Sequence, residues 1–242
     1  MTLLITIFNT ILYRPLFNAL IFLYEYLPGQ DFGVAVIVLT VLIKILFYPL
    51  GMRAIRAQKS LQGLQSKIKE IQEKYKNDRE KQTRSMLELY KKEKINPFSG
   101  FLPLLVQLPI LIALYQVFWG GLQPEKMVNL YSFLPQPGSI DPTFFGILNL
   151  AQPSATLAIF AGISQFFQAK IISPEASKDT KKAGEASQFS KTMKAQMLYF
   201  FPVFTVIILL KLPAAIALYW LVTTLFSIGQ QYLVFKKQTP AG

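Results

Sequence analysis

The sequence predicts an all-α membrane protein with five transmembrane helices, an N-terminal interfacial helix and a cytoplasmic helical hairpin. Three observations indicate this class. The 242 residues are 52% hydrophobic and only 16% charged, whereas average soluble domains carry about 25% charged residues. The apolar residues gather in runs near the roughly 20 residues that a helix needs to cross the bilayer core. The 25 Lys and Arg residues cluster between these runs.

Residues 1–30 are expected to form an amphipathic helix on the outer membrane surface. The apolar stretches on either side of Arg14-Pro15 are each too short to span a bilayer. Proline also suits a first helical turn better than a helix interior. The segment lacks the positive start and small-residue cleavage site of a signal peptide. An additional span is the alternative.

The remaining apolar runs predict five spans, whose order follows from the charges between them. The predicted spans are 31–52, 97–121, 154–172, 195–211 and 212–235. Lys and Arg keep connecting segments in the cytoplasm. We therefore expect three segments to lie in the cytoplasm. They are the basic hairpin at 53–96, a mobile loop at 173–194 and the tail at 236–242. The loop 122–153 has Lys126 as its only basic residue, so we expect it outside the cell. With five spans, the N-terminus then lies outside and the C-terminus inside.

The segment 53–96 is predicted to be a helical hairpin that recruits an acidic partner. It holds thirteen basic and six acidic residues. Apolar residues recur in it at intervals of three and four, which marks a helix face, and Asn77-Asp78 indicates a turn. Anionic lipid headgroups or ribosomal RNA would suit its charge; the alternative is a solvated hairpin that only fixes topology. The expected recruitment residues are Arg53, Arg56, Lys59, Lys67 and Lys74.

Lys44 is the main candidate functional residue. It lies near the middle of the first predicted span. Apart from Asp31 at the very start of that span, no Asp or Glu lies in any predicted span. Because a charge at the bilayer centre costs roughly 2.5–3.5 kcal/mol, we expect Lys44 to face a hydrated groove. Snorkelling to the nearer surface is the alternative. The polar residues expected to line the groove with it, rather than only to bond between helices, are Thr40, Gln107, Gln165, Thr223 and Thr224.

The composition argues against several functions. The chain has no Cys and no His, which removes thiolate metal sites and the commonest general base. We find no nucleophile paired with a base and no phosphate-binding loop, so no enzyme activity, cofactor or metal is predicted. Proton-coupled transporters usually rely on intramembrane carboxylates or histidines. A path for hydrophilic polypeptide segments is favoured, with a small-solute channel or transporter and a structural scaffold as alternatives.

Three groups of motifs are specific enough to suggest a family. They are Thr40–Lys44 with Tyr48-Pro49-Leu50, Asn96–Gly100 with Pro103–Ile110, and Leu218-Tyr219-Trp220 with Gln230-Gln231. With their order, they resemble the YidC/Oxa/Alb family of membrane protein insertases in its short bacterial form, from about Tyr13 to Lys237. Family members typically hold arginine where this chain has Lys44, and lysine lacks the planar donor fork of arginine.

The resemblance implies a function, partners and residue roles. It implies an insertase and chaperone of the bacterial plasma membrane that works without covalent chemistry and without a cofactor. Lys44 would take the basic position of the groove with Thr40 and Gln107 beside it. Pro109, Tyr219 and Trp220 would lie on the exit path of the substrate. The implied partners are nascent membrane proteins and the ribosome, with the Sec translocon and the signal recognition particle receptor as optional ones, and the chain would act as a monomer.

Overall fold

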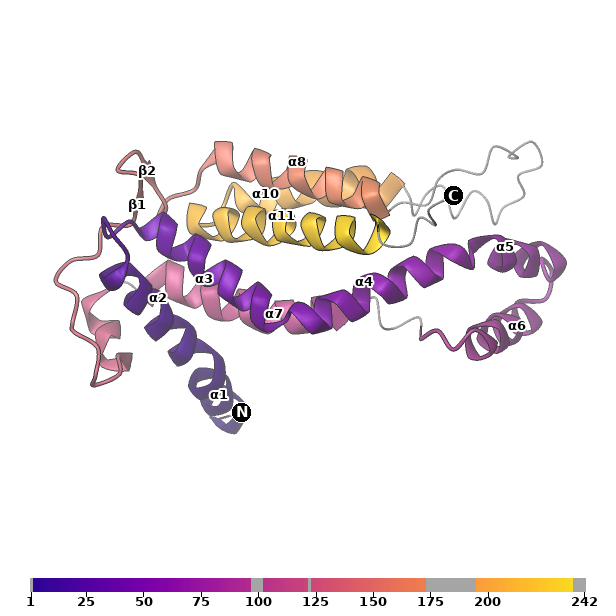
Figure 1. The fold of residues 1–242 in the computed structure, drawn as a ribbon, viewed down its shortest axis with the longest axis horizontal. Coiled ribbons are helices and arrows are strands. Elements are labelled where there is room, and N and C mark those ends of the chain that lie inside the picture. Colours follow the sequence, from indigo (N-terminus) through magenta and orange to yellow (C-terminus); the bar gives the residue numbers. More distant parts are fainter. Residues whose placement is uncertain (1, 97–101, 122, 173–194, 237–242) are drawn as a thin grey trace.

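The structure, a computed structural model of the chain, describes residues 2–96, 102–121, 123–172 and 195–236. These residues are mostly helical, in agreement with the all-α prediction (Figure 1). The α-helices are α1 (Thr2–Phe8), α2 (Arg14–Tyr26), α3 (Phe32–Leu46), α4 (Tyr48–Gly63), α5 (Gln65–Lys74), α6 (Arg79–Lys92), α7 (Leu102–Gln116), α8 (Ala155–Ile172), α10 (Phe201–Leu209) and α11 (Ala214–Lys236). The shorter elements are the π-helices η1 (Asn9–Tyr13), η3 (Val117–Gly121) and η5 (Gln196–Phe200), the 3-10 helix η4 (Pro124–Asn129) and the strands β1 (Thr143–Phe144) and β2 (Leu148–Asn149).

The N-terminal helix continues through Arg14-Pro15, where the apolar pattern of the sequence is interrupted. A proline ring clashes with the carbonyl four residues back in an α-helix. Here the π-helix η1 directly precedes α2, and the Arg14 N–H bonds the carbonyl of Asn9, five residues back. The wider turn accommodates Pro15 without ending the helix. The resulting helix, Leu3–Tyr26, is long and apolar enough to cross a membrane, so the additional span fits by length and composition.

The first predicted span is broken rather than straight. The axes of α3 and α4 differ by 66°, and Pro49 near the start of α4 has no N–H to continue the ladder of α3. Lys44 lies in the last turn of α3, just before this bend, and its depth in the membrane stays a prediction. That position suits a cation, since the carbonyl end of a helix carries partial negative charge.

The number of spans remains a prediction. Among the described residues, Leu3–Tyr26 and Ala155–Ile172 are long and apolar enough to cross a membrane, and the bent α3–α4 pair would be a third. The apolar helices Leu105–Gly120 and Gln196–Leu209 are shorter. Helix α11 has 23 residues, but its Thr, Ser and Gln residues dilute its apolar character.

The core lies where α11 meets its neighbours. Helix α11 packs against α8 and α3, and α3 also packs against α2 (Figure 1). The first residues of α11, from Ala214 to Tyr219, are at most 3% exposed. Helix α10 packs closely on α8 at Gly162, where an added Cβ would lie 2.3 Å from Cγ2 of Val206. This close packing holds α8, α10 and α11 together beside the α3–α4 pair.

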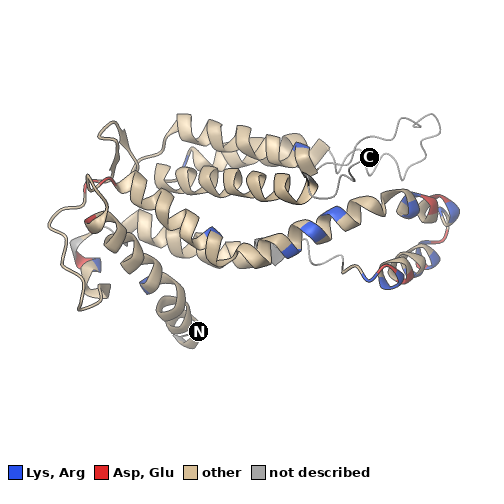
Figure 2. Cartoon of the chain, viewed as in Figure 1, with Lys and Arg blue, Asp and Glu red and all other residues tan. Residues whose placement is uncertain are grey.

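The predicted hairpin at 53–96 is shorter in the structure. Residues 53–63 belong to α4, which packs against α11 and α7 and buries Ala54 and Ile55. The part that extends away from the bundle is the α5–α6 pair, where basic and acidic residues gather (Figure 2). Asp78 caps α6 by accepting a hydrogen bond from the Lys81 N–H at 3.0 Å, and Lys67 pairs with Glu93 at 2.6 Å. The cytoplasmic location of the α5–α6 pair stays a prediction.

The segment 123–153 contains local structure that was not predicted. Strands β1 and β2 form an antiparallel ribbon in which Thr143 pairs with Asn149 and Phe144 with Leu148. Phe145 and Gly146 form its turn, with positive φ angles of 51° and 67°. The predicted loop 173–194, the motif residues 97–101 and the tail residues 237–242 lie outside the described residues.

Candidate functional site

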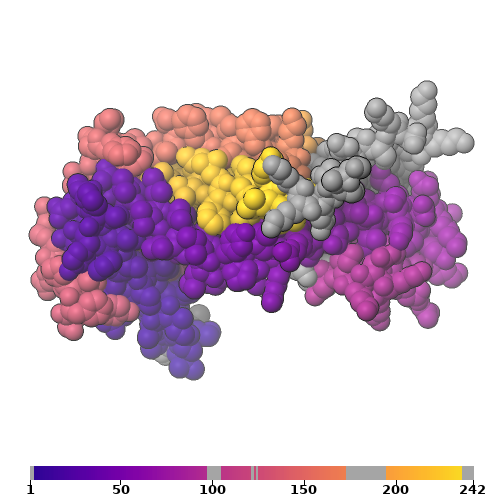
Figure 3. Space-filling model, viewed as in Figure 1, coloured from indigo at the N-terminus to yellow at the C-terminus, as the bar shows by residue number. Residues whose placement is uncertain are grey.

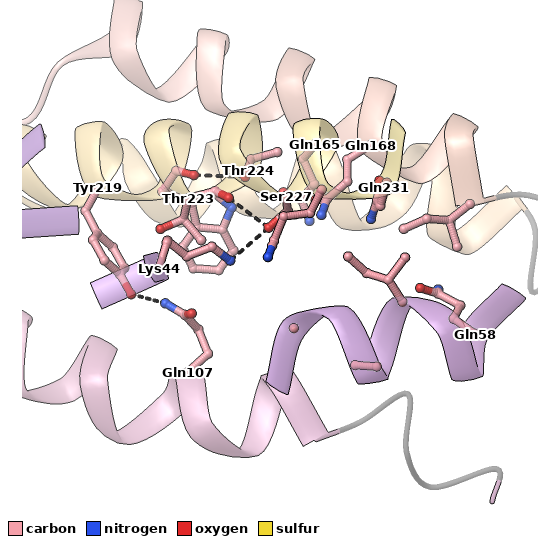
Figure 4. Close-up of a pocket in the computed structure, with 16 residues that line it drawn as sticks. Lys44, Gln58, Gln107, Gln165, Gln168, Tyr219, Thr223, Thr224, Ser227 and Gln231 are labelled. Carbon is pink, nitrogen blue, oxygen red and sulfur yellow. Dashed lines mark hydrogen bonds between the residues drawn. The ribbon is translucent and has the colours of Figure 1, made fainter. Parts of the chain in front are cut away.

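A cavity of about 320 Å³ lies where five helices meet: α3, α4, α7, α8 and α11 (Figure 4). In the space-filling view, α11 forms a band between α8 and the α3–α4 pair (Figure 3). The polar side chains that line the cavity are Lys44, Gln58, Gln107, Gln165, Gln168, Tyr219, Thr223, Thr224, Ser227, Gln230 and Gln231. The described lining includes no Asp or Glu, so the cavity carries positive charge.

Lys44 is held inside this cavity by α11. Its Nζ donates a hydrogen bond to Oγ of Ser227 at 2.9 Å (Figure 4). The Ser227 hydroxyl in turn donates to the carbonyl of Thr223, also at 2.9 Å. The ammonium also lies 5.7 Å from the ring centroid of Phe226, within the range of a cation–π contact. These contacts orient the charge toward α11 and favour the groove over the snorkelling alternative.

A second hydrogen bond joins α7 to α11 at the cavity wall. The side-chain amide of Gln107 donates to the hydroxyl of Tyr219 (Figure 4). Tyr219 is only 1% exposed, so a phenol there needs a polar partner. The amide of Gln107 provides that partner and couples the two helices.

Several amides around the cavity are buried without a partner. Oε1 of Gln165, Nε2 of Gln230 and Oε1 of Gln231 have no hydrogen-bond partner among the described residues. An unsatisfied buried polar atom costs about 1–3 kcal/mol. Buried water commonly satisfies such groups in polar cavities. The arrangement therefore suits a cavity that holds water or a polar guest.

Residues 22–241 match the family described as 60Kd inner membrane protein, which is most of the chain. The chain belongs to this family. Among the described residues of this family member, no group of three or more His, Cys, Asp or Glu residues is placed to hold a metal ion.

Curated relatives carry the name membrane protein insertase YidC. The relative from Lawsonia intracellularis is 33% identical over 228 residues, which cover 94% of this chain and 39% of the relative. The relative from Syntrophus aciditrophicus is 33% identical over 225 residues, covering 92% and 36%. That from Francisella tularensis subsp. novicida is 34% identical over 206 residues, covering 84% and 32%. The chain thus spans about two fifths or less of these relatives, and the resemblance to the YidC/Oxa/Alb family is confirmed.

Most of the predicted groove residues of this family member meet at the cavity. Five of the six line it, together with two predicted exit-path residues, Tyr219 and Trp220. The five are Lys44, Gln107, Gln165, Thr223 and Thr224. Thr40, the sixth predicted groove residue, is not part of the described lining. It is 1% exposed, and its hydroxyl donates to the carbonyl of Val36 at 2.6 Å, so it is satisfied within its own helix. Pro109 is half-buried on α7 and lies outside the lining.

The cavity also has contributors that sequence reasoning missed. Gly51 and Gln58 of α4 line it. Gln58 was missed because residues 53–96 were assigned to the projecting hairpin. An added Cβ at Gly51 would lie 3.3 Å from the amide of Gln230, so a glycine permits the close approach of α4 to α11. The only sequence signal for this close approach was a glycine, Gly51, just before the charged run.

The five predicted recruitment residues divide between two places. Arg53, Arg56 and Lys59 lie on α4, and Lys67 and Lys74 lie on α5. Lys59 is tied to the end of α11, since its Nζ donates to the carbonyl of Phe235 at 3.4 Å and lies 4.8 Å from its ring centroid. The hydrogen bond from Lys67 lowers the pKa of Glu93. A shared recruiting role for the five residues remains untested.

Proposed function

We propose that this chain is a membrane protein insertase. It would move hydrophilic segments of nascent membrane proteins through the cavity around Lys44 and release hydrophobic segments into lipid. One observation carries the proposal: Lys44 donates to Ser227 inside a cavity that five helices line with amides and hydroxyls. The names of the curated relatives support the same activity.

The physical basis is the cost of moving polar groups through hydrocarbon. Backbone amides and acidic side chains cannot enter the bilayer core without large cost. The unpartnered amides of Gln165, Gln230 and Gln231 offer hydrogen bonds to water or to such a segment. The ammonium of Lys44 would attract the acidic side chains of the passing segment. Binding and release of this kind require no covalent step, so the chain would not be an enzyme in the usual sense.

Release into lipid would pass between α7 and α11. We expect Pro109, Tyr219 and Trp220 to flank this path. The hydrogen bond from Gln107 to Tyr219 closes the gap between the two helices. A guest segment that leaves there must break this bond, which makes Gln107 a candidate gate residue.

Recruitment would occur at the basic side of the molecule. The α5–α6 pair and α4 carry the basic residues that suit anionic lipid headgroups or ribosomal RNA. The ribosome, the Sec translocon and the signal recognition particle receptor are further proposed partners. The proposed topology has the N-terminus outside and the C-terminus in the bacterial cytoplasm, with the chain acting as a monomer.

The experiment compares charge variants of Lys44 in proteoliposomes. Lys44→Arg and Lys44→Glu are tested on two substrates that differ only in an acidic or neutral translocated tail. Lys44→Glu should reduce insertion of the acidic tail by roughly tenfold or more, because hydrogen bonds to charged groups contribute about 1.5–3 kcal/mol. Lys44→Arg should retain most activity. Lys211→Glu, on an exposed turn, is the control for net charge.

Two results would remove the proposal. Equal insertion of the acidic tail by the unchanged chain and both Lys44 variants would show that the cavity charge has no part in it. A parallel flux assay addresses the channel alternative: passage of small solutes through the same proteoliposomes, without insertion of either substrate, would favour a channel or transporter.

A further inference from the structure

A second cavity, of about 410 Å³, lies at the other end of α7. It is bounded by the N-terminal helix, the end of α7 with η3, and the 3-10 helix η4. Its main lining side chains can all donate hydrogen bonds: Asn9, Tyr13, Tyr115, Trp119, Lys126 and Asn129. The described lining contains no Asp or Glu, and Glu125 beside it in the chain is exposed. Such a lining suits an anion.

The wall of this cavity is fixed by a buried asparagine. Asn18 of α2 is 3% exposed. Its Oδ1 accepts from the N–H of Tyr131 at 2.6 Å, and its Nδ2 donates to the carbonyl of Asn129 at 3.0 Å. These bonds fasten the end of η4 to α2, so Lys126 and Asn129 stand on an anchored turn. The site is therefore preorganised on the side that carries its charge.

A second cation lies next to the cavity. Arg14 follows the lining residue Tyr13, and its guanidinium lies 5.5 Å from the ring centroid of Tyr131. Its Nε is buried and has no hydrogen-bond partner among the described residues. Together with Lys126, it places two cations beside the cavity.

The surroundings of the cavity indicate an amphipathic ligand. On α7, Leu105, Leu108 and Ile112 are 64%, 46% and 51% exposed, and their spacing places them on one helix face. This apolar face leads to Trp119, which is 60% exposed and stacks on Tyr115 at 5.6 Å between centroids. Tyr and Trp are enriched where acyl chains meet headgroups. The ligand thus has an anionic head and an apolar tail.

We propose that this cavity binds the phosphodiester headgroup of an anionic phospholipid, with its acyl chains along the exposed face of α7. Lys126 would contact the phosphate, and the Asn and Tyr side chains would bind its oxygens and the headgroup hydroxyls. Under the predicted topology the lipid belongs to the outer leaflet. This site is separate from the proposed insertion path, and its test does not measure insertion.

The first experiment measures lipid retention by the full chain. The chain is purified in neutral detergent and incubated with phosphatidylglycerol or phosphatidylethanolamine, and bound lipid is counted by native mass spectrometry. Phosphatidylglycerol should be retained preferentially. Lys126→Gln should weaken its binding about fivefold, the usual contribution of one lysine near anionic lipid. Lys211→Gln, which removes a charge from another exposed turn, should bind like the unchanged chain.

The second experiment identifies the source of the phosphate. Trp119 and Trp220 are the two tryptophans of the chain, so Trp220→Phe leaves Trp119 as the single fluorophore. Phosphatidylglycerol with brominated acyl chains should quench it, and Lys126→Gln should reduce that quenching. Equal quenching by brominated phosphatidylethanolamine, or equal behaviour of Lys126→Gln and Lys211→Gln, would overturn the proposal. Displacement of the lipid by equimolar glycerol phosphate would also overturn it, by indicating a free-anion site.

Discussion

Helices α8 and α10 are packed so closely at Gly162 that adding a single methyl group there should measurably lower the stability of the protein. In Gly162→Ala the new Cβ would lie 2.3 Å from Cγ2 of Val206 and 3.2 Å from the carbonyl oxygen of Pro202. Ordinary contact begins at 3.4 Å, so one helix must shift by about 1 Å or the Val206 side chain must rotate. Overpacking of this kind typically costs about 1–3 kcal/mol.

Gly229→Ala is the matched control, because that glycine also lies in a helix and nothing lies within 4 Å of its added Cβ. Both variants gain about 1 kcal/mol from the helix propensity of alanine. The difference between their free energies of unfolding therefore isolates the clash, and we expect about 1–3 kcal/mol. Reversible unfolding in mixed micelles, followed by circular dichroism, measures it.

Val206→Ala supplies the decisive second step. It removes the Cγ2 atom that clashes, and the next atom of that side chain, Cβ, lies 3.8 Å away. The penalty of Gly162→Ala should therefore largely disappear in a Val206→Ala background, which a double-mutant cycle reports as a coupling free energy. Equal stability of Gly162→Ala and Gly229→Ala, or an unchanged penalty in the Val206→Ala background, would refute the close packing of α8 on α10.

Three further predictions follow from described contacts. Thr40→Val should leave insertion unchanged, because the Thr40 hydroxyl bonds only the carbonyl of Val36; a severe loss in the proteoliposome assay would return Thr40 to the groove. Hydrogen bonds from the backbone and side chain of Lys81 lower the pKa of Asp78 from its ordinary 3.8, so the cap of α6 is fully stabilising above that pH and is lost as pH falls through the lower folded value. Hydrogen exchange at the start of α6 should therefore accelerate in acid, and Asp78→Asn, which still caps, should remove this dependence. Replacing 65–92 by a Gly-Ser linker should preserve the thermal stability of the bundle, whereas replacing 56–92 should lower it because α4 packs against α11; equal melting of both deletions would contradict that packing.

The elements that the sequence predicted well are those with strong local signals. Helix α8 runs from Ala155 to Ile172 against a predicted segment of 154–172, because a long apolar run ends near Lys170 and Pro174. Lys44, Thr223 and Thr224, which the sequence placed together, lie around one cavity in the structure. A charge without an acidic partner in any span, set among amides, has few places to lie in a membrane.

The errors arose where packing between helices decides the outcome. The spacing of Thr40 and Lys44 places them on one helix face, but only tertiary packing determines that Thr40 is buried. Ala54 and Ile55 lie among basic residues, so the charges hid the apolar face by which α4 packs on the bundle. Pro15 indicated an interruption, whereas a wider turn of η1 accommodates it, and this geometry is not readable from composition.

Helix α3 has 15 residues before the chain bends, which corresponds to about 22 Å at 1.5 Å per residue. The hydrocarbon core of a typical bilayer is about 30 Å thick. Tilting accommodates a helix that is too long, but a helix that is too short draws the lipid inward instead. The hydrocarbon beside α3 would therefore be locally thin, and a polypeptide that followed the proposed insertion path there would cross a narrower apolar layer.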